Sequence, residues 1–173
     1  MWAVSASAQA FDLSSNNGRF ELGFNAGKIG TSTPYARFGN GINVMAYGVY
    51  VDFNIANPQH RYDNHYSDTK WEDDEVLMFN AGYQIPVTSW LRVMPLVGYV
   101  QTNEGLTDAS TINVTDDTSR TFYHSYKVTP GTREHYFNCG GGISVQPLKW
   151  FSLNFIYTRY GIYGGFGINL AAF

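Results

Sequence analysis

Apolar and polar side chains alternate with a period of two residues through most of this 173-residue chain. In the segment 76–100, "VLMFNAGYQIPVTSWLRVMPLVGYV", Phe79 and Tyr83 share one phase, whereas Asn80 and Gln84 share the other. Successive side chains of a β-strand point to opposite faces, so each such run predicts a strand with one apolar and one polar face. An all-β fold is therefore expected.

The alternation predicts two strands in the segment 76–100 and one in each of five further segments. These segments are 18–30, 42–54, 135–147, 150–160 and 164–173. Each is close to the roughly 9–11 residues with which a tilted strand crosses a membrane. An up-and-down barrel with both chain ends on one side needs an even number, so eight strands are expected. The eighth is expected in "TPYARFGNG", residues 33–41, or in "SRTFYHSYKV", residues 119–128.

The connections between the predicted strands differ in length. "PVTS", residues 86–89, and "QPLK", residues 146–149, are short turns, whereas the segments 55–75 and 101–131 are long and polar. Short turns on one side and long loops on the other are typical of transmembrane β-barrels.

The composition of the polar phase indicates which way the faces point. A soluble sandwich or lipocalin-like barrel turns its apolar face inward and covers its outer face with Lys, Glu and Asp. Here the polar phase is mostly Gly, Asn, Ser, Thr and Gln, and charged residues are 14% of the chain, against about 25% in soluble domains. Trp90 and Trp150 follow the pattern of rings at the headgroup level of a membrane. We predict an antiparallel up-and-down transmembrane β-barrel, with the soluble architectures as the alternative.

This prediction assigns individual side chains to lipid or lumen. Lys28 and Arg159, in the apolar phase at strand ends, are expected to reach lipid phosphates. The lumenal set either lines a water path or forms the packed core that is usual in eight-stranded barrels. The residues expected to face lipid are Leu77, Phe79, Tyr83, Val93, Val97 and Tyr99. The residues expected to face the lumen are Glu21, Asp52, Asn80, Gln84, Arg92, Asn138 and Asn154.

Composition excludes several other classes of protein. No uninterrupted apolar run approaches the roughly 20 residues of a membrane-spanning helix. A net charge of −3 leaves no basic footprint for nucleic acid. The single cysteine, Cys139, excludes an internal disulfide and a multi-cysteine metal site, and we interpret it as a small apolar side chain on the surface.

The N-terminal segment indicates export. Ala8-Gln9-Ala10 has the small-x-small form of a signal-peptidase site, although a basic start and a long apolar centre do not precede it. Residues 1–10 are therefore predicted to be a signal-peptide remnant, and residues 11–173 to form the barrel domain.

With this strand pattern, signal remnant and loop asymmetry, the chain resembles the small outer-membrane β-barrel proteins of Gram-negative bacteria, the OmpA/OmpX-type group. The resemblance covers nearly all of residues 11–173 and includes the terminal Phe173, which looks like the assembly signal of those proteins. The sequence departs from that signal because Ala171, Asn169 and Gly167 occupy the phase of Phe173. The resemblance implies the outer membrane of a Gram-negative bacterium as the location, with outer-membrane lipid and lipopolysaccharide as partners.

One acidic and histidine-rich segment is the candidate metal site. Its members are His60, Asp63, His65 and Asp68, within "HRYDNHYSDTKWEDDE". Imidazole nitrogens and carboxylate oxygens at this density can ligate a divalent metal, but the spacing matches no named site. The default interpretation is a hydrated surface loop, so no metal and no cofactor are expected.

An enzyme is the least favoured function. His124 and His135 flank the second long segment, with Ser125, Asp116 and Glu134 close in sequence. Surface proteases and lipid acyltransferases of the outer membrane need such groups, but proximity in sequence is not geometry, and no family motif supports either activity. We therefore expect no catalytic activity.

The expected function is structural or interactive. Either the barrel contacts other molecules at the cell surface through segments 55–75 and 101–131, or it is an accessory subunit of a larger outer-membrane assembly. A narrow pore for small or hydrophobic solutes is the alternative.

Overall fold

The computed structural model describes residues 13–33, 36–65, 68–103, 106–112, 123–129 and 133–172, and it describes side chains outside the ranges 57–74 and 104–132. Residues 1–12, which include the predicted signal remnant, and Phe173 lie outside the described residues. Within the described part of the chain, no helix is long and apolar enough to cross a membrane.

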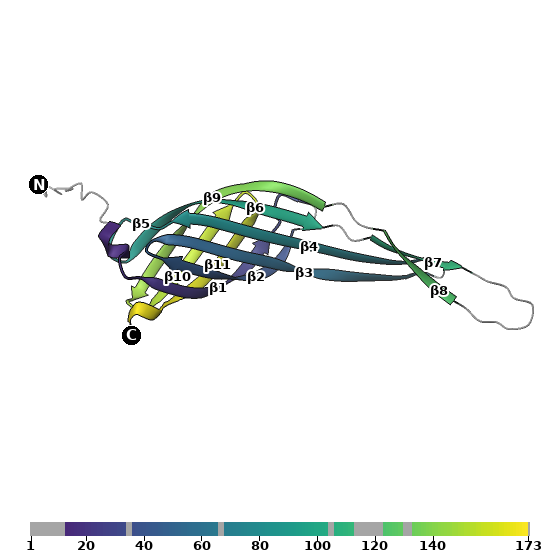
Figure 1. Ribbon diagram of the computed structural model, residues 1–173, viewed down its shortest axis with the longest axis horizontal. Coiled ribbons are helices and arrows are strands. Elements are labelled where there is room, and N and C mark those ends of the chain that lie inside the picture. The colour runs from purple at the N-terminus through teal and green to yellow at the C-terminus, as the bar shows by residue number, and fades with distance from the viewer. Residues whose placement is uncertain are drawn as a thin grey trace, which may run out of the picture.

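Eight antiparallel strands form a closed barrel (Figure 1). Strands that follow one another along the barrel wall are paired, and the pairing of β11 with β1 closes the circle. The predicted all-β, up-and-down barrel of eight strands is thus confirmed. The barrel strands are β1 (Phe20–Ile29), β2 (Arg37–Ala46), β3 (Val49–His65), β4 (Asp68–Tyr83), β6 (Leu91–Asn103), β9 (Arg133–Leu148), β10 (Phe151–Thr158) and β11 (Gly161–Asn169).

The remaining strands extend the barrel sheet. The two-residue strand β5 (Ile85–Pro86) continues the line of β4 and pairs with the start of β6. β3 and β4 run on beyond the barrel as a hairpin, and β7 (Leu106–Ile112) pairs with the outer part of β4. β8 (Tyr123–Thr129) pairs with β7. We call the paired segments 59–65, 68–74, 106–112 and 123–129 the ribbon, which projects from one end of the barrel (Figure 1).

The two ends of the barrel differ. Three short connections lie at the end opposite the ribbon, which we call the turn end: Tyr47–Gly48, residues 87–90 and Lys149–Trp150. The short 3-10 helices η1 (Leu13–Asn16) and η2 (Leu170–Ala172) also lie at the turn end (Figure 1). The chain therefore enters and leaves the barrel on the same side, as an even number of strands requires.

The segment 42–54, predicted as one strand, is the end of β2, a turn and the start of β3. Tyr47 and Gly48 both have positive φ, 51° and 88°, which is typical of a two-residue type I′ hairpin. Ala46 therefore pairs with Val49, and the turn shifts the alternation by one residue. Met45 is only 1% exposed and faces the interior, whereas Val49 is 51% exposed. A single strand over residues 42–54 would place these two side chains on the same face, so that prediction was wrong.

The eighth barrel strand is β2, so the expectation of a strand near residues 33–41 is confirmed for residues 37–41. The other candidate segment, residues 119–128, contributes most of β8, but β8 belongs to the ribbon and not to the barrel wall. The alternation did not identify β2 as a separate strand, because the second half of β2, residues 42–46, was assigned to the same predicted strand as the start of β3.

The interpretation of segment 55–75 as a loop was wrong for most of its length, whereas segment 101–131, whose aromatic pattern also allowed strands that continue beyond the membrane, does contain the strands β7 and β8. β3 and β4 remain paired from Ala56 and Val76 out to His65 and Asp68, with one irregularity between Ala56 and Gln59. The hairpin satisfies its backbone hydrogen bonds internally, so it needs no hydrophobic core beneath it and no apolar alternation. The absence of that alternation is why the sequence indicated a loop.

We predict that Gly48→Ala lowers the free energy of unfolding by about 1–3 kcal/mol, because the turn requires positive φ. A Cβ at this position would also lie 2.5 Å from Asn16 Nδ2 and 2.7 Å from a ring carbon of Tyr83. Urea unfolding in lipid vesicles, followed by the shift of the folded band on unheated gels, measures the loss. Gly164→Ala is the matched control, since its Cβ would meet its nearest atom at 3.6 Å. Equal stability of the two variants would contradict this account of the turn.

Candidate functional site

The outer surface of the barrel is apolar. Each of the eight strands exposes at least one large apolar side chain, and the most exposed are Phe38 at 75%, Tyr157 at 68% and Phe137 at 67%. Monomeric soluble proteins rarely expose contiguous apolar patches of more than a few hundred Å². A surface that is apolar on every strand is that of a transmembrane barrel, as predicted.

The predicted orientations in the segment 76–100 are confirmed. Phe79, Val93, Val97 and Tyr99 are exposed on the outer face, and Leu77 and Tyr83 are partly exposed. Asn80, Gln84 and Arg92 are buried in the interior. The two-residue period was sufficient here because the turn 87–90 separates two regular strands.

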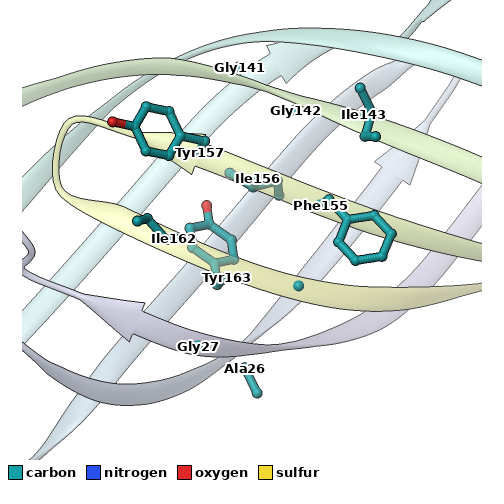
Figure 2. A pocket seen from close by; sticks show the side chains of 11 residues that line it. Ala26, Gly27, Gly141, Gly142, Ile143, Phe155, Ile156, Tyr157, Ile162 and Tyr163 are labelled. Atoms are coloured by element: carbon teal, nitrogen blue, oxygen red, sulfur yellow. The ribbon is translucent and has the colours of Figure 1, made fainter.

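The outer surface is hollowed where β9, β10, β11 and β1 lie side by side (Figure 2). The hollow has a volume of about 740 Å³, and we call it the apolar groove. Ala26 of β1 pairs with Gly164 of β11, which pairs with Phe155 of β10. Ala26 and Gly164 have little or no side chain, so they form a low part of the outer surface. The larger side chains of Phe155, Tyr157 and Ile162 project around them and form the walls of the groove.

A hydrogen-bonded network crosses the middle of the interior, and Asp52 is at its centre. Its Oδ1 accepts from Asn54 Nδ2 at 2.8 Å and from Asn80 Nδ2 at 2.9 Å. Its Oδ2 accepts from the Tyr163 hydroxyl at 2.6 Å, from the opposite wall of the barrel. Three donors therefore satisfy a carboxylate that is buried, which offsets the cost of removing it from water.

Asn138 extends this network to β9 and β10. Its amide nitrogen donates to Asn80 Oδ1 at 2.7 Å and to Thr158 Oγ1 at 3.1 Å. Its carbonyl oxygen accepts from the backbone N–H of Tyr160 at 3.2 Å. The middle of the interior is thus bridged from wall to wall by side chains.

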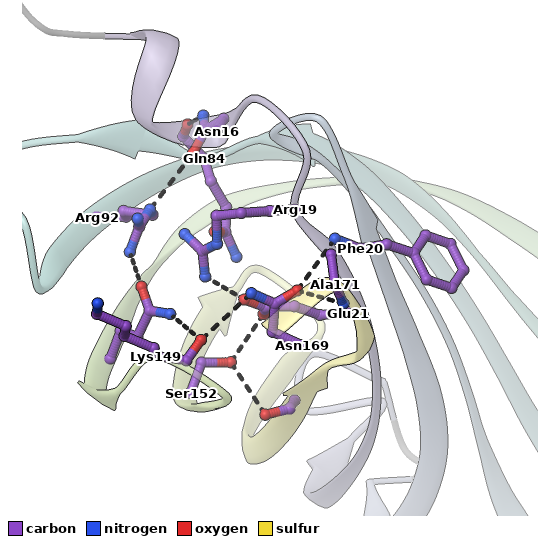
Figure 3. A network of polar contacts seen from close by, with 12 residues as sticks. Asn16, Arg19, Phe20, Glu21, Gln84, Arg92, Lys149, Ser152, Asn169 and Ala171 are labelled. Atoms are coloured by element: carbon purple, nitrogen blue, oxygen red, sulfur yellow. Dashed lines mark hydrogen bonds and ion pairs between the residues drawn. The ribbon is translucent and has the colours of Figure 1, made fainter. Parts of the chain in front are cut away.

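A second network lies at the turn end, around the buried Arg92. Arg92 Nε donates to Asn16 Oδ1 at 3.4 Å, and Nη1 donates to Gln146 Oε1 at 3.0 Å (Figure 3). Asn16 in turn donates to the carbonyl of Gln84 at 2.7 Å. These contacts hold η1 against the ends of β6 and β9, so η1 covers the turn end of the interior.

Glu21 lies beside this network and forms a buried ion pair with Arg19. Its second oxygen accepts from Ser152 Oγ at 2.8 Å, which joins β1 to β10 (Figure 3). Asn169 of β11 donates to the carbonyl of Lys149 at 3.2 Å. The predicted lumenal residues Glu21, Asp52 and Arg92 are therefore anchors of a packed interior.

The ribbon end of the interior is apolar, which the sequence analysis did not predict. The rings of Tyr136 and Tyr160 pack against each other there in a tilted arrangement, with centroids 5.1 Å apart. Aliphatic and aromatic side chains of this kind do not favour a hydrated path. The buried members of the layer are Ile29, Ala56, Val76, Val100 and Tyr160. Met78, Leu96 and Ile156 are also buried in the interior.

The candidate metal ligands lie in the ribbon, where the structure describes the backbone only. His65 pairs with Asp68 next to the tip of the hairpin, and Asp63 pairs with Lys70. His60 pairs with Asp73, five residues along β3 from His65. Among the side chains that are described, no three His, Cys, Asp or Glu residues form a group that could hold a metal ion.

The residues considered for catalysis are not brought together in the described part of the chain. His135 stacks on Tyr99 with ring centroids 5.7 Å apart and shares a short hydrogen bond with its hydroxyl. Glu134 accepts instead from the Tyr136 hydroxyl. His124 and Ser125 belong to β8 in the ribbon. Asp116 lies outside the described residues.

Lys28 and Arg159 are exposed at the ribbon end, as expected for cations at a membrane rim. The guanidinium of Arg159 lies 5.2 Å from the ring centroid of Tyr160. The Ser32 hydroxyl donates to the Arg159 carbonyl at 2.7 Å, and the Gly30 N–H donates to the Tyr160 carbonyl at 2.7 Å. The β1–β2 connection is thus held against the β10–β11 turn.

No family model and no curated protein matches the chain. Solved structures with a similar fold include Ail, the attachment invasion locus protein of Yersinia pestis, in complex with the heparin analogue sucrose octasulfate. It is 10% identical, with a TM-score of 0.49, over 87% of this chain and 94% of that chain. A major outer membrane protein from Thermus thermophilus is 12% identical, with a TM-score of 0.49, over 88% and 98%.

The N-terminal β-barrel domain of Pseudomonas aeruginosa OprF is also similar. It is 15% identical, with a TM-score of 0.43, over 88% of this chain and 98% of that chain. None of these similarities assigns a function to this chain. The strand pairings of the chain itself show the fold: it is an eight-stranded antiparallel barrel of the transmembrane type, the architecture of the small outer-membrane barrels that the sequence resembles.

We predict that Asp52→Ala lowers the free energy of unfolding by roughly 3 kcal/mol or more, because it leaves three buried donors without their acceptor. Asp52→Asn is the matched control, since it keeps the volume and one acceptor oxygen, and it should cost less. Urea titration in lipid vesicles, read by band shift, compares the two. If Asp52→Ala is as stable as the parent protein, the network does not hold the barrel walls together.

Proposed function

We propose that this protein is a non-conducting barrel of the Gram-negative outer membrane, and that it displays the ribbon outside the cell as a surface for binding other macromolecules. The observation that carries the proposal is the inverted barrel, with an apolar outer face on all eight strands around an interior of buried polar and apolar side chains. The proposal assigns no catalytic activity to the chain.

The energetics of the outer face favour lipid as its surroundings. Burying apolar surface contributes about 25 cal/mol per Å², so a belt of aromatic and aliphatic side chains in water would drive aggregation. In the hydrocarbon of a membrane, the closed backbone ladder leaves no strand edge unpaired within the barrel wall. Trp90 and Trp150 are exposed at the turn end, at the level where aromatic rings meet headgroups.

The asymmetry of the ends supports one orientation. Outer-membrane barrels place short turns in the periplasm and long connections outside. The turn end would therefore face the periplasm, and the ribbon would stand in the extracellular medium.

A filled interior supports a role other than transport. Side chains occupy the interior at three levels. These are the network around Arg92 at the turn end, the network around Asp52 in the middle, and the apolar layer at the ribbon end. Eight-stranded barrels are in general only wide enough for their own side chains. A narrow pore, the alternative from the sequence, would need a water path past all three of these levels.

The ribbon has strand edges at which a partner can bind. β8 pairs with β7 on one side, and the outer part of β3 pairs with β4 on one side. An exposed edge offers unpaired N–H and C=O groups to an extended segment of another chain. The partner is a surface ligand or a subunit of a larger outer-membrane assembly.

We predict that Val97→Arg lowers the stability of the inserted barrel by about 2–4 kcal/mol, the cost of Arg on a lipid-facing strand near the midplane. Val97 is 56% exposed in the middle of β6. Val87→Arg is the matched control, because Val87 is 48% exposed in a connection at the turn end. Urea unfolding in lipid vesicles measures both. On a water-facing surface both changes would be neutral within about 0.5 kcal/mol, and that outcome would contradict the membrane location.

We predict that deleting residues 61–74 abolishes partner binding and leaves the barrel intact, since the barrel pairings end at Ala56 and Val76. Photo-crosslinking on whole cells, followed by purification of the barrel, compares the deletion with the full chain. The deletion should still fractionate with the outer membrane and shift on unheated gels. Both forms should be silent in planar bilayers. Step-like conductance from the full chain would contradict the non-conducting assignment, and identical crosslinks in both forms would contradict the role of the ribbon.

A further inference from the structure

We propose that the ribbon-end half of the wall formed by β9, β10, β11 and β1 is a binding site for one lipopolysaccharide molecule. An acyl chain would lie in the apolar groove, and a phosphate of the glycolipid headgroup would be held by Lys28 and Arg159. The inference rests on the proposed membrane location and adds to it a specific lipid site.

The groove and the two cations lie on the same strands in the correct order for such a lipid. Ala26 lies at the groove, and Lys28 follows it two residues further toward the ribbon end on the same face of β1. Tyr157 lies at the groove on β10, and Arg159 follows it at the β10–β11 turn. Moving from the groove toward the ribbon, a lipid would pass from apolar walls to positive charge, which matches an acyl chain below a phosphate.

The cations are close enough to act on one headgroup. Lys28 pairs with Ile162, three residues after Arg159. The two backbones are therefore one to two strand spacings apart, roughly 5–10 Å, within reach of both flexible side chains. The hydrogen bonds from Gly30, Thr31 and Ser32 to the carbonyls of the β10–β11 turn fix this corner, so little ordering is needed on binding.

The outward-facing positions of this wall carry basic residues and no acidic residue, because Glu21 of β1 and Glu134 of β9 lie in the inward-facing phase of their strands. Neither residues 22–51 nor residues 135–173 contain an Asp or Glu, although the chain carries 14 of them. The same two segments contain Lys28, Arg37, Lys149 and Arg159. In a protein of net charge −3, the acidic residues are concentrated elsewhere in the chain, so this wall attracts anionic lipid while the protein as a whole does not.

The level of the site favours lipopolysaccharide over the phospholipids of the inner leaflet. The groove lies toward the ribbon end of β1, β10 and β11, and in the proposed orientation that end faces outward. The outer leaflet of this membrane is built of a phosphorylated glycolipid with several saturated chains. A phospholipid at the turn end would meet Lys149 and not the pair of Lys28 and Arg159.

Native mass spectrometry of the full-length barrel in detergent micelles, titrated with bis-phosphorylated lipid A, tests the site. The parent protein should retain one lipid A molecule. The double variant K28Q/R159Q should bind roughly tenfold more weakly, since it loses charge-assisted contacts to phosphate. Gly164→Val should weaken binding to a similar extent by filling the groove.

Matched controls separate the site from general effects. Lys149→Gln removes an exposed cation at the turn end, and it should bind lipid A as the parent protein does. A Cβ at Gly164 would meet its nearest atoms at 3.6–4.0 Å, so the wall accepts a Cβ at this position, and Gly164→Ala serves as the control for the added backbone constraint. A shift on unheated gels confirms that each variant is folded.

The outcomes distinguish this inference from the proposed function. If K28Q/R159Q and Gly164→Val bind lipid A like the parent protein, the site is wrong, while the membrane location stands. If phosphatidylglycerol binds as tightly as lipid A and is lost in the same variants, the assignment to lipopolysaccharide is wrong. If Val97→Arg costs nothing in vesicles, the membrane location fails and the lipid site fails with it.

Discussion

The structure depends on the closure of the backbone hydrogen-bond ladder. The pairings of β4 with β6 and of β11 with β1 complete the circle, so backbone groups of the barrel wall are satisfied by neighbouring strands. A closed ladder tolerates surroundings that offer no hydrogen bonds, which an open sheet does not. Closure also divides each strand into an inward and an outward phase, and a circle of eight strands encloses only enough space for the inward side chains.

The interior uses that space for connections between walls. A buried carboxylate, Asp52, receives donors from three strands, and a buried guanidinium, Arg92, holds the first helical turn against the opposite wall. Polar groups in such a place are stabilising only when their partners are present, so the networks specify one cross-section of the barrel. The apolar layer at the ribbon end completes the filling without adding polar groups. The barrel therefore serves as a rigid base, and the chemistry available to partners lies on its outer wall and on the ribbon.

Prediction from the sequence succeeded where side chains alternate without interruption and failed where the pattern carries no information on pairing. The strand around Phe24 and the hairpin around Phe79 and Val97 were assigned correctly. A shift of one residue would turn the apolar face of such a strand to the wrong side, so the alternation determines which face each side chain occupies. At Tyr47–Gly48 the alternation continued through a two-residue turn, which concealed one strand and reversed the face of Met45. The outer part of the β3–β4 hairpin was missed because a hairpin that covers no core needs no apolar phase. The proposed lipid site depends on β1, β9, β10 and β11 being neighbours, and only the closed topology makes them so.

The sequence by itself determined the class of fold and the environment of each face, because the two-residue period and the scarcity of charge depend only on local geometry and transfer free energy. The tertiary structure decided which strands are neighbours, where the alternation changes phase, and which polar groups meet in the interior. Those features depend on contacts between residues far apart in the chain, such as Asp52 with Tyr163 and Arg92 with Asn16. A periodic pattern cannot encode them, because many arrangements of the same strands would place the same residues on the same faces.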